Sequence, residues 1–248
     1  MIAHVDADAF FASVLVRKDP RLKGKPLIAL GMGGGCVIAA TYEAKAKGVK
    51  TGMPLKDALR LCPEALRLPS DFRETGLASE QIEAILRDIC PVIEQMSVDE
   101  WYLDLTTLVG GAPADPRAWA TQVQQRILRQ TALSVSVGVG PSKLLAKMAG
   151  EYRKPAGVTV VDGRLAPGGM DIETFLRDRP AAAIPGIGPR RLTHAVARHW
   201  ETAWDIVTAD PETIAHLYGK SGTDIQHELL GICTDPVAED TSPPKSIS

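Results

Sequence analysis

The sequence predicts an α+β protein in which a split βαβ, ferredoxin-like sheet is followed by an all-helical segment. As far as Asp162, apolar runs of strand length alternate with helical patterns in the order β-α, then α-β-β-α-β-α-β. Beyond Asp162 only short helical patterns follow, without a strand signal. With 248 residues, 45% of them hydrophobic, the chain is long enough for two or three compact units.

The first forty residues contain three predicted strands and one helix. Ile2–Asp6 is an apolar run that begins with a β-branched residue, which is typical of a buried strand. Phe10–Val16 has a helical pattern that is broken by the following Asp-Pro pair. Pro26–Leu30 and Cys36–Ala40 are strand-like and are joined by a glycine-rich turn, so we expect a hairpin.

Three helices are predicted next. Tyr42–Lys47 is helical up to Gly48, a residue suited to the position after a helix C-terminus. Pro54–Cys62 is a second short helix, because proline is favoured at a helix start and Pro63 follows its end. Ser70–Cys90 is the longest helical pattern of the first half, with four isoleucine and leucine residues along one face.

The remaining elements complete the predicted sheet. We expect strands at 92–98, 101–105, 134–138 and 158–161, with helices at 116–129 and 142–151 between them. Asp99 and Glu100 lie in the tight link between the first two of these strands. A change of composition then marks a domain boundary near 162–170, and the proline-containing tail 235–248 is predicted to be a linker.

Composition excludes several classes of protein. The most apolar runs are only as long as strands, and the N-terminus has no basic region, so we expect a cytoplasmic protein without a membrane span. The four cysteines are scattered without a CxxC pair, which favours buried free thiols over a disulfide or a zinc site. The formal charge of −2 gives no electrostatic sign of nucleic-acid binding.

The carboxylates at the strand ends are the candidate catalytic groups. Alternation along a strand lets Asp6 and Asp8 share one side. Neighbouring central strands would bring Asp6 beside Asp99 and Glu100, where like charges repel unless divalent cations intervene. Oxygen ligands select Mg²⁺ or Mn²⁺, and two such ions about 4 Å apart catalyse in-line phosphoryl transfer. Taken alone, these carboxylates could equally be surface groups at strand ends.

Two longer stretches decide between these interpretations. The segments DADAFFASV at 6–14 and SVDEWYLD at 97–104 closely resemble the two catalytic signatures of Y-family DNA polymerases, the error-prone lesion-bypass class. Further segments resemble the fingers (42–45, 48–49 and 53–54), the second palm segment (142–147 and 154–157) and the helix-hairpin-helix turn of the thumb (184–188). The resemblance extends over essentially the whole chain.

The resemblance implies a division into named parts. The catalytic palm would comprise 1–15 and 71–162 and have the ferredoxin-like sheet. A small α/β fingers insertion would occupy 16–70, and an all-α helix-hairpin-helix thumb would occupy 163–234. The tail 235–248 would lead to the basic fourth domain of the family, which this chain would lack as a truncated form.

The resemblance also implies roles for single residues. The catalytic metal ligands would be Asp6, Asp99 and Glu100, with the Ala7 carbonyl completing the shell of one Mg²⁺ or Mn²⁺ ion. Nucleotide-binding residues would be Phe11, Tyr42, Lys45 and Lys154, of which Phe11 would act as a steric gate against a ribose 2′-hydroxyl. DNA phosphates would be held at Gly186, Gly188 and Arg190, where backbone N–H groups face an anion.

Three positions depart from the family pattern. Lys45 stands where arginine is usual, which removes a bidentate phosphate contact and weakens the expected grip on the nucleotide. Leu15 stands where a glutamate commonly follows the first signature, and Ala156 replaces the usual asparagine.

The expected activity is therefore translesion DNA synthesis, with deoxynucleoside triphosphates and primer-template DNA as substrates. A sliding clamp would be a further partner, contacted through the region that follows Ser248 in the family. A non-catalytic DNA-binding scaffold is the main alternative, although it would be expected to have lost the metal ligands. A nucleotidyl cyclase would share the sheet but lack the fingers segment and the thumb turn.

Overall fold

The computed structural model describes residues 1–162 and 169–238. The strands are β1 (Ile2–Ala7), β2 (Leu27–Leu30), β3 (Val37–Ala40), β4 (Leu66–Pro69), β5 (Ile93–Gln95), β6 (Glu100–Asp104), β7 (Val135–Gly140) and β8 (Val158–Val160). The α-helices are α1 (Phe10–Lys18), α2 (Tyr42–Lys45), α3 (Leu55–Leu61), α4 (Phe72–Ile89), α5 (Pro116–Thr131), α6 (Lys143–Tyr152), α7 (Ile172–Arg177), α8 (Pro189–Val196), α9 (Ala203–Thr208), α10 (Pro211–Tyr218) and α11 (Lys220–Leu229). Three short 3₁₀ helices are η1 (Pro20–Leu22), η2 (Leu105–Thr107) and η3 (Ala181–Ala183). This mixture confirms the α+β class.

The main sheet is built around β1. Its order is β5-β6-β1-β7-β8, with β1 antiparallel to both neighbours and β8 parallel to β7. All six residues of β1 are buried, which explains the nearly continuous apolar run in the sequence. The register places Asp6 opposite Glu100 on one side and Ser136 on the other.

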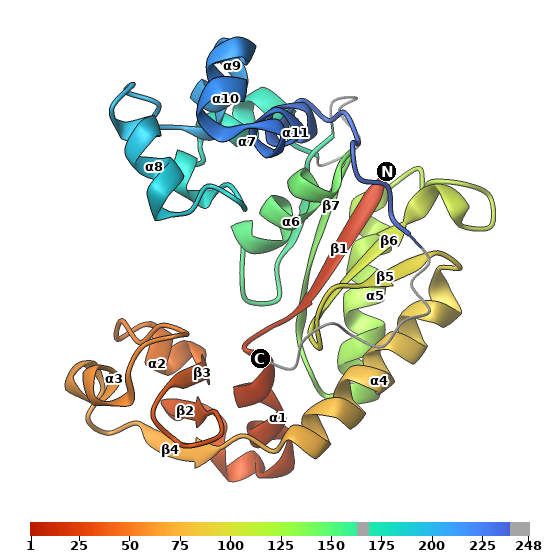
Figure 1. Cartoon of the computed structure of the whole chain (residues 1–248). Helices are drawn as coiled ribbons and strands as arrows, with labels where there is room; N and C mark the ends of the chain where they lie inside the picture. Colours follow the sequence, from red (N-terminus) through yellow and green to blue (C-terminus); the bar gives the residue numbers. More distant parts are fainter. Residues whose placement is uncertain (163–168, 239–248) are drawn as a thin grey trace.

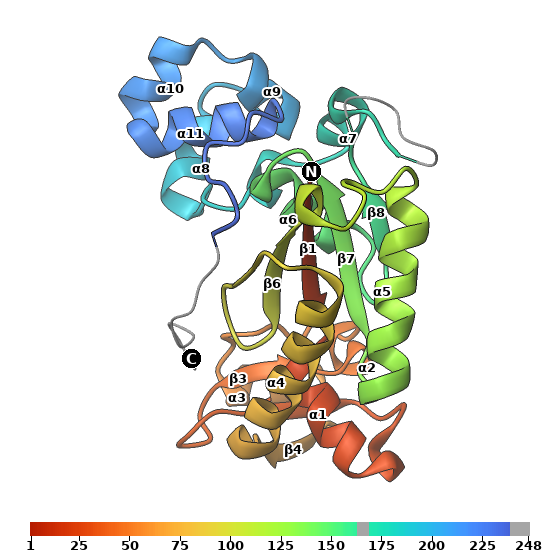
Figure 2. The ribbon, with the colours of Figure 1, turned by 90° about the vertical axis from the view of Figure 1, so that its right-hand side faces the viewer.

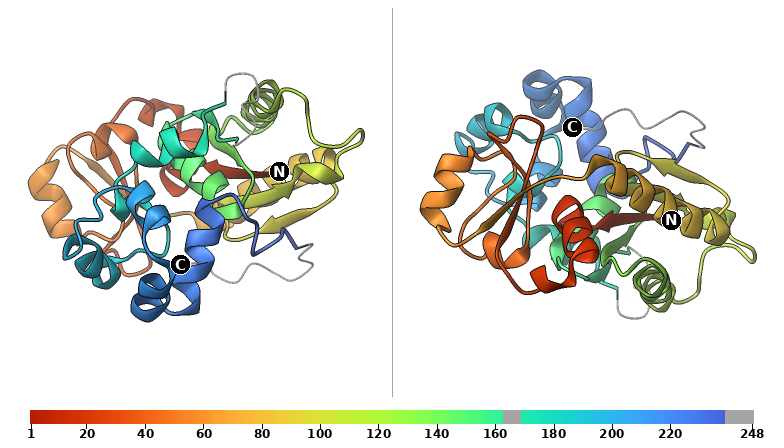
Figure 3. Two further views of the ribbon diagram at one scale, coloured as in Figure 1. Left: turned by 90° about the horizontal axis from the view of Figure 1, so that it is seen from above. Right: turned by 90° about the horizontal axis from the view of Figure 1, so that it is seen from below.

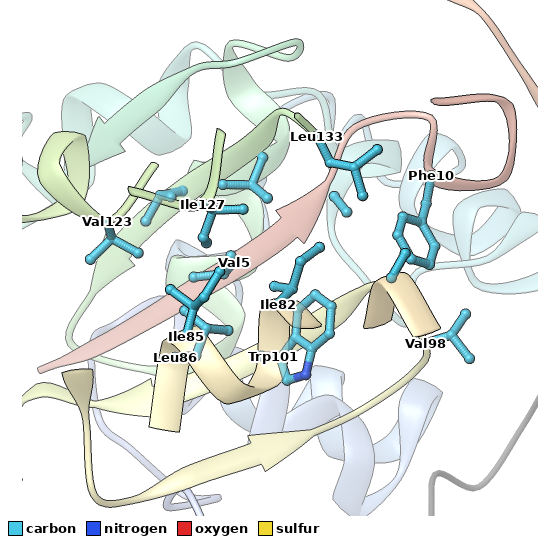
Figure 4. Close-up of a cluster of buried hydrophobic side chains, with 14 of the residues drawn as sticks. Val5, Phe10, Ile82, Ile85, Leu86, Val98, Trp101, Val123, Ile127 and Leu133 are labelled. Atoms are coloured by element: carbon cyan, nitrogen blue, oxygen red, sulfur yellow. The ribbon is translucent and has the colours of Figure 1, made fainter. Parts of the chain in front are cut away.

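Helices cover the two faces of this sheet unequally. Helices α4 and α5 pack on one face, where Val5, Ile82, Leu86 and Ile127 are fully buried in the main core (Figure 4). Helix α6 packs on the other face against β1 and β7 (Figures 1 and 2).

A smaller sheet lies beyond α1 at one end of the molecule (Figure 1). Its order is β3-β2-β4, and α2 and α3 pack against it around a separate core that includes Ile28 and Val37. The predicted hairpin of β2 and β3 is present. Strand β4 was not predicted, because Leu66–Pro69 is short, largely exposed and ends in proline, and it pairs with β2 only through the tertiary fold.

The described part of the chain beyond residue 168 is helical. Helices α7 to α11 surround a core that contains Phe175, Ile206 and Leu229 and also reaches Leu145 of α6. Helix α11 packs on α6, so this helical segment lies over the sheet on the side of α6 (Figure 3). Helix α8 ends at Val196, three residues before His199, whose φ of +57° is incompatible with a helix.

Two other predictions need correction. The strand expected at 92–98 is limited to Ile93–Gln95, and the chain bends at 97–99 before β6 begins at Glu100. All four cysteines are free thiols, but Cys36 and Cys233 are exposed and only two of them are buried.

Within residues 1–162 and 169–238, every helix is too short or too polar to traverse a lipid bilayer. Most of the predicted linker, residues 239–248, lies outside the described part of the chain.

Candidate active site

A cleft of about 350 Å³ lies where β1 ends and β6 begins, next to the small sheet. Seven of the predicted site residues line this cleft, namely Asp6, Ala7, Phe11, Lys45, Asp99, Glu100 and Lys154. One strand pairing and one backbone hydrogen bond bring the carboxylates together. Asp6 and Glu100 are direct cross-strand partners, and the Ala7 amide donates to the Asp99 carbonyl at 2.9 Å.

Asp6 is the most strongly perturbed carboxylate of the cleft. Its residue is only 6% exposed, and the Lys154 ammonium lies 2.6 Å from its Oδ1 atom. Burial raises the pKa of Asp6 to about 8, even though Lys154 opposes the shift. The same ammonium lies 2.6 Å from Glu151, so Lys154 is shared between two acids. The negative form of Asp6 is therefore costly unless a cation is close to it.

Glu100 is surrounded differently. The Lys147 ammonium is 2.6 Å from its Oε1 atom. Burial is the largest single influence and would raise the pKa of Glu100, but the attraction and hydrogen bond of Lys147, together with smaller contributions from other neighbours, outweigh it and the pKa is lowered. Glu100 is thus held as a carboxylate by a lysine of α6.

Asp99 is fixed by its own loop. The Ser97 hydroxyl donates to its Oδ1 atom at 2.6 Å, and burial raises the pKa of the Asp99 carboxyl. The bend at 97–99 makes this contact possible, because a regular strand would direct Ser97 and Asp99 along the same face without bringing them together.

His4 is a neighbour of this cluster that the sequence analysis did not select. It is fully buried on the same face of β1 as Asp6, and one ligand atom from each of His4, Asp6 and Glu100 lies within 4.8 Å of the others. Burial lowers the pKa of His4 to about 3, so its ring is neutral. Neither ring nitrogen has a hydrogen-bond partner among the described residues. The sequence did contain a signal for His4: it lies two residues before Asp6, and residues two apart in a strand point to the same face.

The donor atoms fit a divalent cation that prefers oxygen. Three acidic residues and Ala7 line the cleft, and carboxylate and carbonyl oxygens are the type of ligand that Mg²⁺ and Mn²⁺ select. Asp8, by contrast, is not a member of this set. Strand β1 ends at Ala7, and the Asp8 carboxylate accepts from the Ser136 hydroxyl at 2.7 Å and the Ala156 amide at 2.8 Å. Asp8 nevertheless lies on the same side as Asp6, as expected, because Ser136 is the cross-strand partner of Asp6, but Asp8 does not line the cleft.

The predicted nucleotide-binding residues lie at the rim. The Phe11 ring lines the cleft while packing edge-on against Phe72, with ring centroids 5.9 Å apart. The Lys45 ammonium lies 4.6 Å from the centroid of the Tyr42 ring, and burial, followed by repulsion from Lys154, lowers the pKa of Lys45. The Tyr42 hydroxyl donates to Asp8 at 3.4 Å, so Tyr42 lies behind Lys45 and does not line the cleft itself.

The predicted DNA-contact residues form a separate group. Gly186 and Gly188 are exposed in the turn before α8, and Arg190 is exposed in the first turn of that helix, within the helical segment. Pro185 of this turn lines a second cleft of about 400 Å³ together with Lys143, Lys147 and Lys220, which links the turn to α6.

A larger cleft of about 760 Å³ lies elsewhere, between α1 and the start of α4. Its charged residues are paired with each other, Lys18 with Asp71 at 2.6 Å and Arg21 with Asp19 at 2.8 Å. The cleft at the end of β1 is the better candidate, because it brings three acidic residues and two lysines together in one place.

Known proteins resemble this chain in sequence. The sequence model of the impB/mucB/samB family matches residues 5–151. The chain is 37% identical over 240 residues to DNA polymerase IV 1 of Halalkalibacterium halodurans, covering 96% of this chain and 56% of that protein. It is 40% identical over 237 residues to DNA polymerase IV of Gluconobacter oxydans, covering 95% and 65%. The chain thus spans less than two thirds of the length of these two curated relatives.

Solved structures show the same relationship. The crystal structure of DinB from Sulfolobus solfataricus superposes with a TM-score of 0.85 at 31% identity, covering 96% of this chain and 69% of that one. The insertion ternary complex of Dbh DNA polymerase gives a TM-score of 0.83 at 31% identity, covering 95% and 69%. Sequence and fold together show that the chain belongs to the impB/mucB/samB family of Y-family DNA polymerases.

Proposed function

We propose that this chain carries out template-directed DNA synthesis of the lesion-bypass type, adding deoxynucleotides to the 3′ end of a primer. The observation that carries the proposal is the composition of one cleft. It combines Asp6, Asp99 and Glu100 with Lys45 and Lys154, that is, oxygen ligands for cations beside cations for a triphosphate. The relatives named DNA polymerase IV support the same activity.

Asp6, Asp99, Glu100 and the Ala7 carbonyl would hold two divalent cations. Bound there, Mg²⁺ or Mn²⁺ would neutralise charge on the triphosphate and lower the pKa of the attacking hydroxyl. Hydrogen bonds within the chain orient two of these ligands. The Ser97 hydroxyl donates to one oxygen of Asp99, and the Lys147 ammonium donates to one oxygen of Glu100. The remaining oxygen of each carboxylate is then available for a cation.

Lys45 and Lys154 would bind the triphosphate and stabilise the negative charge that develops on the leaving pyrophosphate. Lys154 is the residue that must change partners. Its ammonium is bound to Asp6 and Glu151, and a phosphate oxygen would replace one of them while a cation neutralises Asp6. Tyr42 supports Lys45 through the contact between its ring and the ammonium.

Three of the hydrophobic clusters of the described residues support the division into palm, fingers and thumb. We infer that the five-stranded sheet is the ferredoxin-like palm (1–15 and 71–162), that the small sheet with α2 and α3 is the fingers (16–70), and that α7 to α11 form the thumb (163–234). Helix α1 runs across the first boundary, which would couple the palm rigidly to the fingers. In the thumb, the turn with Gly186 and Gly188, together with Arg190, would hold DNA phosphates.

Primer extension with Mg²⁺ tests the proposal. We expect Asp99→Asn to reduce single-turnover extension by about a hundredfold or more, because it removes an anionic metal ligand. Glu80→Gln is the matched control, since Glu80 is an exposed acid on α4 outside the cleft, and it should extend like the unmodified chain. An unmodified chain that binds primer-template DNA without extending it would instead identify a non-catalytic scaffold.

A further inference from the structure

Two adjacent arginines at the start of α8 differ in their surroundings and contacts. The side chain of Arg190 is exposed, and among the described residues its guanidinium makes no hydrogen bond or ion pair. The guanidinium of Arg191 is directed into the protein. It donates to the Gly186 carbonyl at 2.9 Å, to the Ser221 hydroxyl at 3.2 Å and to the Tyr218 carbonyl at 3.4 Å.

These contacts connect two turns that are about thirty residues apart in sequence. One is the turn 184–188 before α8, and the other is the turn 218–221 between α10 and α11. The connection is reciprocal, because the Tyr218 hydroxyl donates to the Arg191 carbonyl at 3.0 Å and the Arg191 guanidinium lies 5.6 Å from the Tyr218 ring centroid. Tyr218 itself is buried in the core of the helical segment.

We propose that Arg191 is a positioning residue that holds the turn 184–188 in the conformation required for contact with DNA. This inference rests on the proposed function of that turn. All three of its acceptors are neutral, so the role of Arg191 is to fix geometry by hydrogen bonding. Arg190, which has no partner in the described part of the protein, is the arginine available to a phosphate.

The turn 184–188 requires a stabilising contact because its glycines make the backbone flexible. Gly186 has a φ of +91°, and a Cβ atom at this position would lie 3.0 Å from the Ile225 side chain. Glycine permits this conformation but also permits many others, so its backbone loses more entropy on ordering than other residues do. Ile184 and Ile187 anchor the turn in the core. The Gly186 carbonyl lies between these anchors, and Arg191 is the side chain that binds it.

The first experiment measures amide hydrogen exchange of the whole chain without DNA. We expect Arg191→Ala and Arg191→Lys to accelerate exchange at 184–188 and 218–221 by about threefold to tenfold, because the donors of a lysine share one nitrogen and cannot reproduce the contacts that Arg191 makes from two. Arg190→Ala should leave exchange at both turns unchanged. Since the hydrophobic core of the segment is untouched, each variant should retain its fold, which circular dichroism would verify.

The second experiment measures affinity for a primer-template duplex at several salt concentrations. Arg190→Ala should weaken binding and reduce the slope of log affinity against log salt by about 0.9, the value for one phosphate contact. Arg191→Lys should weaken binding by about threefold to tenfold with an unchanged slope, because the charge is retained and the geometry is lost.

The outcomes separate this inference from the proposed function. Unchanged exchange at both turns in Arg191→Ala would overturn the positioning role, even if DNA binding and extension were normal. Full affinity of Arg191→Lys would also overturn it, by showing that charge alone suffices. An unmodified chain that fails to bind DNA would refute both the function of the turn and the role of Arg191 in it. Faster exchange combined with weaker binding at constant salt slope would establish the proposal.

Discussion

Phe11 has two sets of contacts, and they allow its packing to be separated from its proposed role in sugar selection. One edge of the ring packs against Phe10 and Phe72 in the main core, and another part lines the cleft. An aromatic ring held in this way is rigid, and a rigid ring can exclude a hydroxyl group that a mobile side chain would tolerate.

We therefore expect Phe11→Ala to reduce the preference for deoxyribonucleotides over ribonucleotides by about tenfold or more, since removing an overlap of this type is worth about 1–3 kcal/mol. The ratio of incorporation efficiencies would be measured in both proteins. Phe72→Ala is the control, because Phe72 packs on Phe11 without lining the cleft. It should lower the melting temperature and reduce the ratio much less than Phe11→Ala does, because the ring of Phe11 remains and still packs against Phe10. Equal ratios for the two variants would mean that Phe11 is only a core residue.

Lys45 allows a gain of function to be tested. Its ammonium is half-buried over the Tyr42 ring, a position in which an arginine could stack equally well. Because guanidinium binds phosphate through two donors, we expect Lys45→Arg to lower KM for the incoming nucleotide by about threefold to tenfold. Lys45→Met should raise KM, and steady-state kinetics on one primer-template would give both values. A KM that is indifferent to both substitutions would place the triphosphate elsewhere.

Among the secondary-structure elements, α6 has the closest approach to the sheet. A Cβ atom on Gly138 of β7 would lie 2.1 Å from the Ala146 carbonyl oxygen, which is a prohibitive overlap with backbone. The helix can therefore approach β7 only over glycine, and this approach brings Lys147 to Glu100. The segment that follows α6 carries Lys154 to Asp6.

Gly138→Ala should therefore displace α6 and impair activity without touching a site residue. We expect a loss of about 2 kcal/mol or more in the free energy of unfolding, and a loss of extension larger than the fraction of unfolded protein explains. Gly76→Ala in α4 is the matched control, because a Cβ atom added to Gly76 would meet no described atom within 4 Å. In that helix interior, alanine should stabilise the protein by about 0.5–1 kcal/mol. Denaturant unfolding and primer extension on the same samples would distinguish the two outcomes.

At the scale of the whole molecule, Glu228 joins the helical segment to the main sheet. It is a buried carboxylate at the end of α11, and it accepts from the Leu144 amide of α6 at 3.2 Å and from the Thr234 amide at 2.6 Å. Nearby, Lys143 binds Glu94 of β5 at 2.6 Å and Asp235 at 2.9 Å. These contacts determine where the chain leaves the helical segment and crosses toward the edge of the sheet.

Glu228→Gln should loosen this connection, because the amide presents donors to N–H groups that need an acceptor. We expect a loss of about 2 kcal/mol in the free energy of unfolding, as is typical for hydrogen bonds to a charged group, and faster amide exchange at 234–238. Glu212→Gln, a change at an exposed acid of α10, should have little effect on either quantity. Unaltered exchange at 234–238 in Glu228→Gln would show that other contacts hold the tail.

The sequence by itself determined the α+β class, most helices and strands, and the family. These properties depend on local patterns: apolar spacing, proline and glycine at element ends, and the two long signatures around Asp6 and Asp99. The convergence of Asp6 with Glu100 also followed from the sequence, because residues at the ends of neighbouring strands meet when the strand order is known. For the same reason, the cleft contains seven of the predicted residues.

Only the tertiary structure decided the features that depend on contacts between distant segments. Strand β4 exists because β2 offers it a partner, and His4 became part of the site because β6 and α6 enclose it. Contacts between distant segments also decide that the Arg190 side chain faces solvent, whereas the Arg191 guanidinium donates to two carbonyls and a hydroxyl. In sequence the two arginines are equivalent neighbours. They differ because successive helical residues point about 100° apart, and the second turn lies on only one of the two sides.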